Sequence, residues 1–336
     1  MILYNVSLIL IIIYVIRLYE AINVVTSCEN GTWIDGSNYV KHPFSDVQVY
    51  SEKEDDEATD RLKEWYMQAC PAESRLYSCS FQGATKKRLN KLASRKWIPA
   101  EDKKCLEFWS SNFIEGINGR RVLLIGDSLM FQTYSALICE LLQYTKYSLY
   151  MNWGKNNQDH CGDDLNHCIS LRSLFLTSKN SSISFRRENK MSLNFLLDTI
   201  KVDAKLKEND IVIINAGAHY HDKVIYKNLL LTIKEGFDKE DNLPSLFFLE
   251  STPSHFYSPS NPSGYWNTDY IRSNSNCTPF ENLNDAKSSD WRNNIADEVF
   301  RDSSKFTIIR IADGLYSQFD AHMGIFINHN YYYLLN

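Results

Sequence analysis

The sequence predicts an α/β fold, in which a parallel sheet carries helices on both faces and follows a smaller, disulfide-stapled N-terminal lobe. Two observations favour this class. From about residue 120 onward, short apolar runs alternate with longer amphipathic segments, which is the pattern of strands and covering helices. Before that point the chain is irregular and contains four of its eight cysteines. With 336 residues, 44% of them hydrophobic, the chain can bury one large core beside a smaller lobe.

The alternating pattern also predicts the individual elements. Strands are expected where the β-rich apolar runs fall, at 121–125, 183–187, 210–215, 245–250 and 307–311. Helices are expected in the amphipathic segments between them, at 130–144, 193–206, 222–237 and 289–300. A further helix-like segment, 59–68, lies in the N-terminal lobe.

The N-terminal segment predicts entry into the secretory pathway. Residues 1–16 are almost wholly apolar and are followed by Arg17. Because a membrane-spanning helix needs about 20 apolar residues and a signal sequence about 7–15, this segment fits either a cleaved signal or a short membrane anchor. An even number of cysteines, together with sequons at Asn30, Asn180 and Asn276, is typical of an oxidising lumen. We therefore expect a protein of the Golgi lumen, anchored by residues 1–16, or a secreted one.

The first motif with chemical meaning is Gly126-Asp127-Ser128, at the end of the strand predicted at 121–125. The helix predicted from residue 130 would place the Ser128 hydroxyl at the carboxyl end of a parallel strand, where ligands bind in open α/β sheets. Gly126 permits a tight turn, Asp127 is a good helix cap, and the helix N-terminus offers N–H groups to an oxyanion. From the residues alone, Ser128 is equally well explained as a nucleophile or as part of the helix cap.

The second motif, Asn215-Ala216-Gly217-Ala218-His219, ends the strand predicted at 210–215 and so is expected at the same edge of the sheet. The Asn215 amide can donate to an oxyanion, and Gly217 lets the backbone approach a substrate closely. His219 and His221 are expected to line the pocket rather than to act as the base. This second strand end favours the nucleophilic interpretation of Ser128.

These two strand ends resemble blocks one and three of the SGNH (GDSL-type) hydrolases. Further segments resemble the PC-esterase branch of that superfamily, which includes the plant trichome-birefringence-like polysaccharide O-acetyltransferases. They are 28–33, 96–99 with Cys105 and Phe108, 119–139, Glu250 to Phe256 including His255, Gly264-Tyr265-Trp266, and Asp320-Ala321-His322-Met323-Gly324. Their order along the chain carries more weight than any one of them.

The resemblance implies an SGNH-like fold, a serine nucleophile at Ser128, and a histidine base oriented by an aspartate. The family takes this dyad from a late Asp-x-x-His, which is not found after Gly324 in this sequence. Three alternatives stay open: Asp320 and His322 replace the dyad, His329 replaces the base, or the dyad is missing because the chain is truncated. We favour the last, which predicts a weakly active or inactive polypeptide.

Other functions are excluded or set aside. A net charge of -5 with scattered Lys and Arg argues against nucleic-acid binding. No cofactor is expected, since the sequence has no phosphate-binding glycine loop with a lysine. No metal is expected either, because Cys161 and Cys168 suit disulfides better than zinc. Trp266 and His255 are expected to line a substrate site, with Trp266 a candidate for stacking on a sugar.

We therefore expect residues 1–23 to form the targeting segment, 24–113 the cysteine-containing lobe, 114–324 the SGNH/PC-esterase-like domain and 325–336 an atypical tail. The expected function is transfer of an acyl group, most simply acetyl, through Ser128 to a hydroxyl of a polysaccharide or glycoprotein glycan, from a donor that the sequence does not identify. A carbohydrate acetyl esterase and a catalytically inactive glycan-binding protein are the alternatives.

Overall fold

A computed structural model describes the chain in part. Residues 115–127, 180–217, 219–253 and 290–316 are described fully, parts of 129–137 and 282–288 are added, and the short strands outside these ranges are described by their backbone. The targeting segment 1–16, the helix expected at 59–68 and all eight cysteines lie outside the described residues, so the disulfide-stapled lobe stays a prediction. Among the helices that are described, none combines the length and the apolar character that a bilayer span requires.

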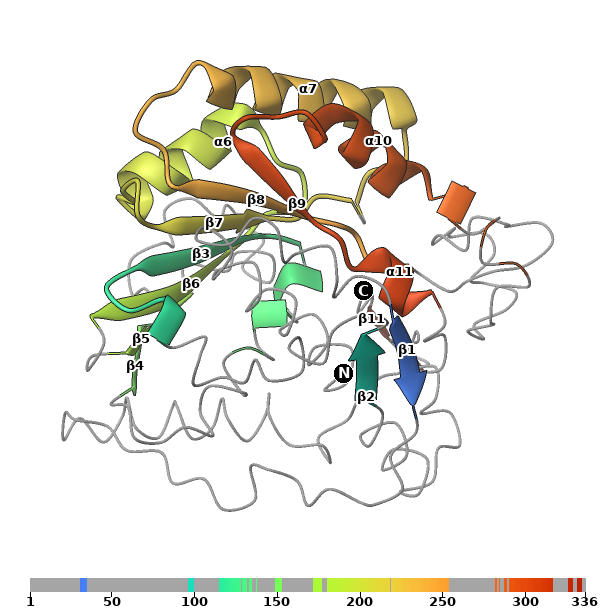
Figure 1. The fold of residues 1–336 in the computed structure, drawn as a ribbon, viewed down its shortest axis with the longest axis horizontal. Coiled ribbons are helices and arrows are strands. Elements are labelled where there is room, and N and C mark those ends of the chain that lie inside the picture. Colours follow the sequence, from blue (N-terminus) through green and yellow to red (C-terminus); the bar gives the residue numbers. More distant parts are fainter. Residues whose placement is uncertain are drawn as a thin grey trace.

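The described chain centres on a seven-stranded sheet (Figure 1). Its strands, in spatial order, are β4 (Leu149–Asn152), β5 (Arg172–Leu176), β6 (Ser181–Arg187), β3 (Arg121–Gly126), β7 (Ile211–Ile214), β8 (Ser245–Leu249) and β9 (Phe306–Ile309). The strands from β6 to β9 are all parallel, which confirms the parallel sheet and all five expected strands. The sequence analysis missed β4 and β5, which extend the sheet by antiparallel pairing.

The parallel strands follow the order of a doubly wound sheet. Counted along the chain, β3 is first, β6 second, β7 third, β8 fourth and β9 fifth, so their spatial order is 2-1-3-4-5. The chain reverses its direction of travel across the sheet between β3 and β7. In such sheets the carboxyl ends of the two strands at this switch point form the usual ligand site. The residues after Gly126 and after Ile214 therefore form the candidate ligand site of this fold.

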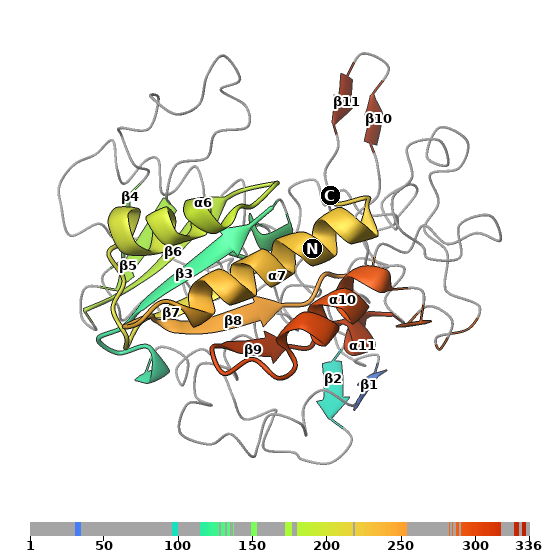
Figure 2. The same cartoon turned by 90° about the horizontal axis from the view of Figure 1, so that it is seen from above.

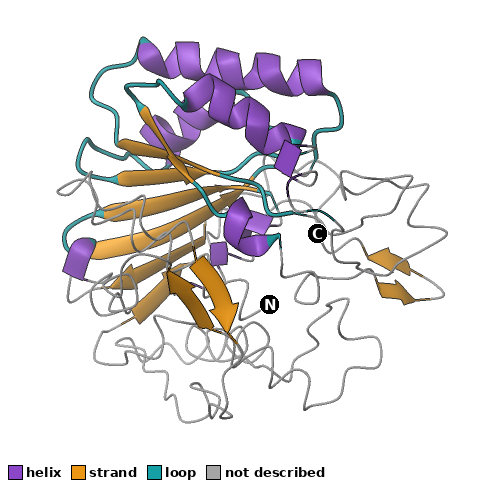
Figure 3. Ribbon diagram, turned by 45° about the vertical axis from the view of Figure 1, so that its right-hand side comes forward, coloured by secondary structure: helices purple, strands orange, loops and turns teal. Residues whose placement is uncertain are grey.

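Three helices cover one face of the sheet (Figures 1 and 3). They are α6 (Leu193–Asp198), which continues into a π-helical turn η7 (Thr199–Asp203), α7 (Lys223–Asp238) and α10 (Trp291–Phe300). Seen from above, they lie over the strands, and α7 runs roughly along them (Figure 2). Their buried side chains form one core with alternate residues of the strands, including Leu123, Val212 and Phe248. The expected helices 193–206, 222–237 and 289–300 are thus confirmed, with small shifts at their ends.

Side-chain caps set where these helices begin. Ser192 accepts from the Phe195 N–H at 3.2 Å, and Asp222 accepts from the N–H groups of Val224 and Ile225 at 2.8 and 3.0 Å. Such caps satisfy N–H groups that have no partner within the helix. The η7 turn ends where Lys205 adopts a left-handed conformation with φ of 50°, a conformation common just after a helix.

The helix that follows Asp127, described in part between Leu129 and Leu137, lies on the opposite face of the sheet. Phe131 and Tyr134 of this helix pack on Phe185 of β6, with ring centroids 5.4 and 5.6 Å apart. Phe185 pairs in register with Leu124, whose neighbours Leu123 and Ile125 face the core under α7. Helices therefore lie on both faces of the sheet, as the sequence predicts.

Two small antiparallel pairs complete the described backbone. Strand β1 (Gly31–Ile34) pairs with β2 (Lys96–Pro99), opposing Trp33 and Trp97, and so joins two segments that the family resemblance had singled out. Strands β10 (Phe326–Asn328) and β11 (Tyr331–Tyr333) form the other pair, within the tail. Neither pair was expected from the sequence. A one-turn helix, α11 (Ala312–Leu315), follows β9 and was also missed.

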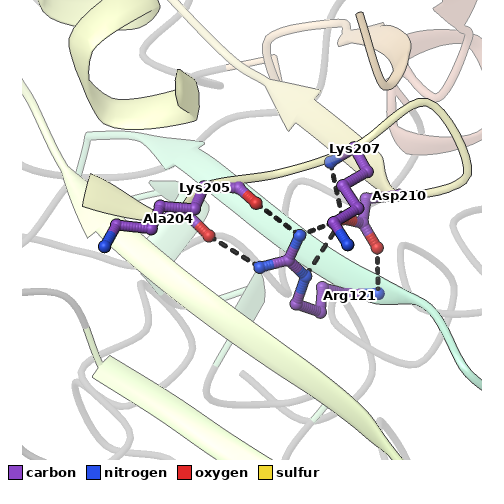
Figure 4. Close-up of polar contacts among 5 residues, drawn as sticks. All are labelled: Arg121, Ala204, Lys205, Lys207 and Asp210. Carbon is purple, nitrogen blue, oxygen red and sulfur yellow. Dashed lines mark hydrogen bonds and ion pairs between the residues drawn. The ribbon is translucent and has the colours of Figure 1, made fainter. Parts of the chain in front are cut away.

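An ion pair between Arg121 and Asp210 links the amino ends of β3 and β7 (Figure 4). The Asp210 carboxylate, 6% exposed, accepts from the Arg121 backbone N–H at 2.8 Å, from Arg121 Nε at 3.0 Å and from the Lys207 N–H at 2.8 Å. The same guanidinium donates to the carbonyls of Ala204 and Lys205, which follow the η7 turn. One arginine therefore joins β3, β7 and a helix end.

We predict that Asp210→Asn lowers the free energy of unfolding by about 2 kcal/mol. The substitution removes a buried negative charge and turns amide protons toward groups that are themselves donors. Chemical denaturation measures the change. The matched control is Asp238→Asn, which breaks a more exposed i,i+4 pair with Lys234 and should cost less than about 0.5 kcal/mol. Equal effects of the two substitutions would contradict the structural role of the Arg121–Asp210 pair.

Candidate active site

The helix that follows β3 is capped by Asp127. The Asp127 carbonyl accepts the first helical hydrogen bond, from the Phe131 N–H at 3.0 Å, and its carboxylate accepts from the Leu129 N–H at 2.8 Å. Gly126 is required by close packing, because a Cβ there would lie 2.5 Å from Met130 Cβ and 3.0 Å from the Asn215 carbonyl oxygen. Asp127 therefore caps the helix as expected, whereas Gly126 is the last residue of β3 and is needed for close packing instead of a tight turn.

Ser128 lies outside the described residues, although Asp127 and Leu129 on either side of it are described. Its expected role as the nucleophile therefore stays a prediction. The structure does bear on the competing interpretation, in which the hydroxyl belongs to the helix cap. Since the Asp127 carboxylate already accepts from Leu129, the helix has a side-chain cap that does not involve Ser128.

Asn215 brings the second motif into direct contact with the first. Its backbone N–H donates to the Ile125 carbonyl at 2.9 Å, so the end of β7 lies against the end of β3. Its buried side chain donates through Nδ2 to the carbonyls of Leu249 at 3.0 Å and Glu250 at 3.3 Å. Both amide protons therefore have acceptors, whereas Oδ1 is buried and has no hydrogen-bond partner among the described residues. An oxyanion role for Asn215 would require one of these protons to be redirected.

The space that a side chain at Gly217 would need is filled by Ser251. A Cβ at Gly217 would lie 1.9 Å from Ser251 Oγ and 3.1 Å from Ser251 Cβ. Ser251 is the second residue after β8, is buried, and its hydroxyl has no hydrogen-bond partner within the described part of the chain. The close approach expected at Gly217 is thus real, but its partner in this structure is Ser251. Ser251 was not identified from the sequence as a site residue, because only the fold brings the ends of β7 and β8 together.

His219 lies on a turn that is held by hydrogen bonds of its neighbour Tyr220. The Tyr220 N–H donates to the Gly217 carbonyl at 3.0 Å, and the Met191 N–H donates to the Tyr220 hydroxyl at 2.7 Å. The carbonyl of Tyr220 accepts from Arg292 Nε at 2.9 Å. Nε2 of His219 is buried and has no hydrogen-bond partner among the described residues. One nitrogen of this half-buried imidazole is therefore still available.

Asp127 and His219 influence each other electrostatically. Burial raises the pKa of Asp127, although the Leu129 N–H and the charge of His219 oppose this shift. Burial lowers the pKa of His219; the charge of Asp127 opposes the shift, and Arg187 and Lys190 add to it. The neutral imidazole is favoured, and a neutral imidazole can accept a proton or a hydrogen bond.

A buried polar network supports the strand exit at Ser251. Asn293 of α10 accepts from the Ser251 N–H at 2.8 Å and donates to the Ser251 carbonyl at 2.9 Å, as a neighbouring strand would. The Asp290 carboxylate accepts from Asn293 Nδ2 at 2.9 Å and from the Tyr316 hydroxyl at 2.7 Å. This network could not be predicted from the sequence, because its members come from three separate elements.

Glu250 connects the same edge of the sheet to α11. Its carboxylate accepts from the N–H groups of Ile311 and Ala312 at 2.8 and 3.0 Å, while its own carbonyl accepts from Asn215. Burial raises the pKa of Glu250 from 4.5 to about 7, even though these two N–H groups and the charge of Arg310 act in the opposite direction. A carboxyl group that titrates near neutrality therefore lies next to Asn215.

The remaining expected site residues lie outside the described residues: Asp320, His322, His255 and Trp266. Their roles in catalysis or substrate binding stay predictions. The Cys and His residues at 160–168, weighed above as a zinc site, are also outside, and the described residues contain no cluster of groups suited to a metal ion.

The fold and the site together define an α/β protein whose two chemically suggestive motifs meet at the switch point of a doubly wound sheet. Comparison with known families agrees with this class. Residues 107–246 match the PC-Esterase family model, described as a GDSL/SGNH-like acyl-esterase family found in Pmr5 and Cas1p. The match spans both motifs, from before Gly126 to beyond Gly217, and supports an acyl-esterase type of domain there. No curated protein matches the chain, and no solved structure matches it.

We predict that Gly217→Ala destabilises the protein by about 1–3 kcal/mol, because the new methyl group would overlap the Ser251 side chain. Ser251→Gly in the same chain removes the overlapping atoms. The double variant should therefore be more stable than the sum of the two single changes implies, by about 0.5–3 kcal/mol. Denaturant unfolding of all four proteins measures this coupling. Additive effects would show that the two side chains are not in contact.

Glu250 should make stability depend on pH. The folded chain binds the Glu250 proton more tightly than the unfolded chain, so this group's contribution is complete below pH 4.5 and is lost as the pH rises to about 7. Glu250→Gln should flatten this decline in the free energy of unfolding, which is at most about 3–4 kcal/mol at roughly 1.4 kcal/mol per pKa unit. Unfolding free energies measured across the window provide the test. The control Glu298→Gln, which removes an exposed carboxylate, keeps Glu250 and should keep the decline.

Proposed function

We propose that the chain transfers an acyl group, most simply acetyl, through an ester of Ser128 to a hydroxyl group of a polysaccharide or glycoprotein glycan. The observation that supports this proposal most directly is the contact between the two motifs. Gly126-Asp127 and Asn215 meet at the carboxyl ends of β3 and β7, within the segment that resembles an acyl-esterase family. Serine nucleophiles of α/β enzymes act at such an edge, where the chain leaves a strand and enters a helix.

The proposed reaction has two steps. In the first, a base removes the Ser128 hydroxyl proton while the oxygen attacks the acyl carbon of the donor. The leaving alcohol then takes a proton and departs, so that the acyl group is esterified to Ser128. In the second step a glycan hydroxyl loses its proton to the same base, attacks the ester and releases Ser128. Water in place of the glycan gives the esterase reaction by the same route.

Asn215 is the proposed side-chain donor to the oxyanion. Of its two hydrogen bonds, the one to the Glu250 carbonyl is long, at 3.3 Å, and is the weaker. Redirecting that proton toward a substrate oxygen costs little, while the bond to Leu249 continues to hold the side chain. One such donor is typically worth about 2.7–4 kcal/mol in the transition state.

Of the three alternatives that the sequence leaves open, an active enzyme would use His322 as the base, oriented by Asp320, although the sequence favours a missing dyad. His329 is the second candidate, and a polypeptide without an effective base is the third. The last would keep the binding site and act as a glycan-binding protein. We place the reaction in the secretory pathway, either in the Golgi lumen with residues 1–16 as the anchor or outside the cell.

Ser128→Ala should abolish both acetylated glycan and released acetate, because no acyl ester can form on the alanine side chain. The full chain is incubated with an acetyl ester and a mixture of glycan acceptors, and both products are measured by mass spectrometry. Acetylated glycan supports the transferase, and free acetate alone supports the esterase.

The matched control is Ser245→Ala, at the amino end of β8 and so at the opposite edge of the sheet, which should retain the activity of the parent protein. Activity that is unchanged by Ser128→Ala would overturn the acyl-enzyme mechanism. A parent protein that binds glycan but forms neither product would leave the glycan-binding alternative.

A further inference from the structure

Glu250 follows β8 directly and is bound to three different parts of the described chain. Its N–H donates to the Ile309 carbonyl of β9 at 3.1 Å, and its carbonyl accepts from Asn215 Nδ2 at 3.3 Å. Its carboxylate accepts from the N–H groups of Ile311 and Ala312 at 2.8 and 3.0 Å. One residue therefore joins the end of β7 to the start of α11.

The start of α11 depends on the Glu250 carboxylate. Ile311 and Ala312 are both buried, and their N–H groups donate to the same oxygen, Oε2 of Glu250. Because a buried backbone N–H is destabilising when it has no acceptor, these two groups favour the position of α11 in which the carboxylate is within reach.

The other end of α11 is also bound to a carboxylate. Tyr316 follows α11 directly, is buried, and its hydroxyl donates to Asp290 at 2.7 Å. Asp290 also accepts from Asn293 at 2.9 Å, and Asn293 pairs with the backbone of Ser251. Both ends of α11 are therefore connected to the residues that directly follow β8.

The sequence that follows α11 contains the candidate dyad. Asp320 and His322 come shortly after Tyr316, although both lie outside the described residues. The segment that carries them begins at α11, whose place is set by the contacts of Glu250 and Asp290. Glu250 is thus bonded on one side to Asn215, the proposed oxyanion donor, and on the other side to the helix that precedes the candidate base.

We propose that Glu250 is a positioning residue that couples Asn215 to α11 and so sets the oxyanion donor relative to the segment that carries the candidate base. Glu250 acts through Asn215 and α11 rather than on the substrate. The catalytic meaning of this role rests on the proposed function, whereas the coupling itself is a property of the fold.

Titration of Glu250 makes this coupling measurable. Burial raises the pKa of Glu250 to about 7, and the charge of Asp290 adds to this shift, whereas the two N–H groups and the charge of Arg310 oppose it. The charged groups around it thus come from the start of α10 and the end of β9. Tyr316 at the end of α11 stays protonated, since burial and the charges of Asp290 and Glu250 raise its pKa. Because an ionised carboxylate accepts hydrogen bonds more strongly than a protonated one, ionisation of Glu250 should strengthen its bonds to α11.

NMR spectroscopy of the full chain tests the coupling without any turnover. Arg310-Ile311 is the only Arg-Ile pair in the sequence, so isotope labels on arginine carbonyls and isoleucine nitrogens select the Ile311 amide. In protein labelled on asparagine, the side-chain signal of Asn215 is the one that Asn215→Asp removes. Both signals should shift with one common midpoint near pH 7, because the same carboxyl group acts on both.

Glu250→Gln should abolish both shifts, because the amide keeps an acceptor oxygen but does not ionise in this range. The matched control Glu298→Gln removes an exposed carboxylate that pairs with Lys227 and should keep both shifts. Shifts that persist in Glu250→Gln would overturn the proposal. An Asn215 signal that does not follow the Ile311 titration would also overturn it, since Glu250 would then bind α11 without influencing Asn215.

Turnover of an acetyl ester supplies the second measurement. Glu250→Ala should lower kcat at least about tenfold with little change in KM, because misplaced catalytic groups affect the transition state more than substrate binding. Glu250→Gln should recover most of this loss, since its amide oxygen can accept from the two N–H groups. Glu298→Ala is the control and should keep the parental kcat. A parental kcat in Glu250→Ala, or an equal loss in the control, would overturn the positioning role.

The two proposals fail in different ways. If the Ile311 and Asn215 signals titrate together but the parent protein turns over no acetyl ester, the proposed function falls and the coupling stands. If the parent protein shows Ser128-dependent turnover but the two signals share no midpoint, only the role of Glu250 falls.

Discussion

The parallel pairing of β3 with β6 and β7 is the constraint on which the rest of the described structure depends. Residues 122–125 are buried on both faces, so their backbone groups must be satisfied by the neighbouring strands. A shift in register would leave buried groups unpaired. The register therefore fixes which residues meet at the carboxyl edge, namely Gly126, Arg187 and Asn215.

The two ends of this sheet differ in how their polar groups are satisfied. At the amino ends, the Asp210 carboxylate and the Arg121 guanidinium engage each other and the surrounding backbone. At the carboxyl ends, Asn215 Oδ1, His219 Nε2 and Ser251 Oγ are buried without a partner among the described residues. Because an unsatisfied buried polar group costs about 1–3 kcal/mol, the amino end favours stability and the carboxyl end favours ligand binding.

Burial also makes the carboxyl edge electrostatically unusual. It raises the pKa values of Asp127, Glu250 and Asp290 and lowers that of His219, so burial shifts each of the four groups toward its neutral form. The charges of Arg187 and Lys190 add to the lowering of the His219 pKa, so positive charge lies near this edge although the protein as a whole is acidic.

The sequence by itself determined the five parallel strands, the covering helices and the two motifs, since periodicity, strand-end glycines and helix caps are local properties. It also placed Gly126, Asp127 and Asn215 at one edge, because parallel strands share their carboxyl ends. Only the tertiary structure decided the strand order, the partners of the Asn215 amide and the contact between Gly217 and Ser251. Those depend on which strands become neighbours, and pairing between residues far apart in the chain leaves no local pattern in the sequence.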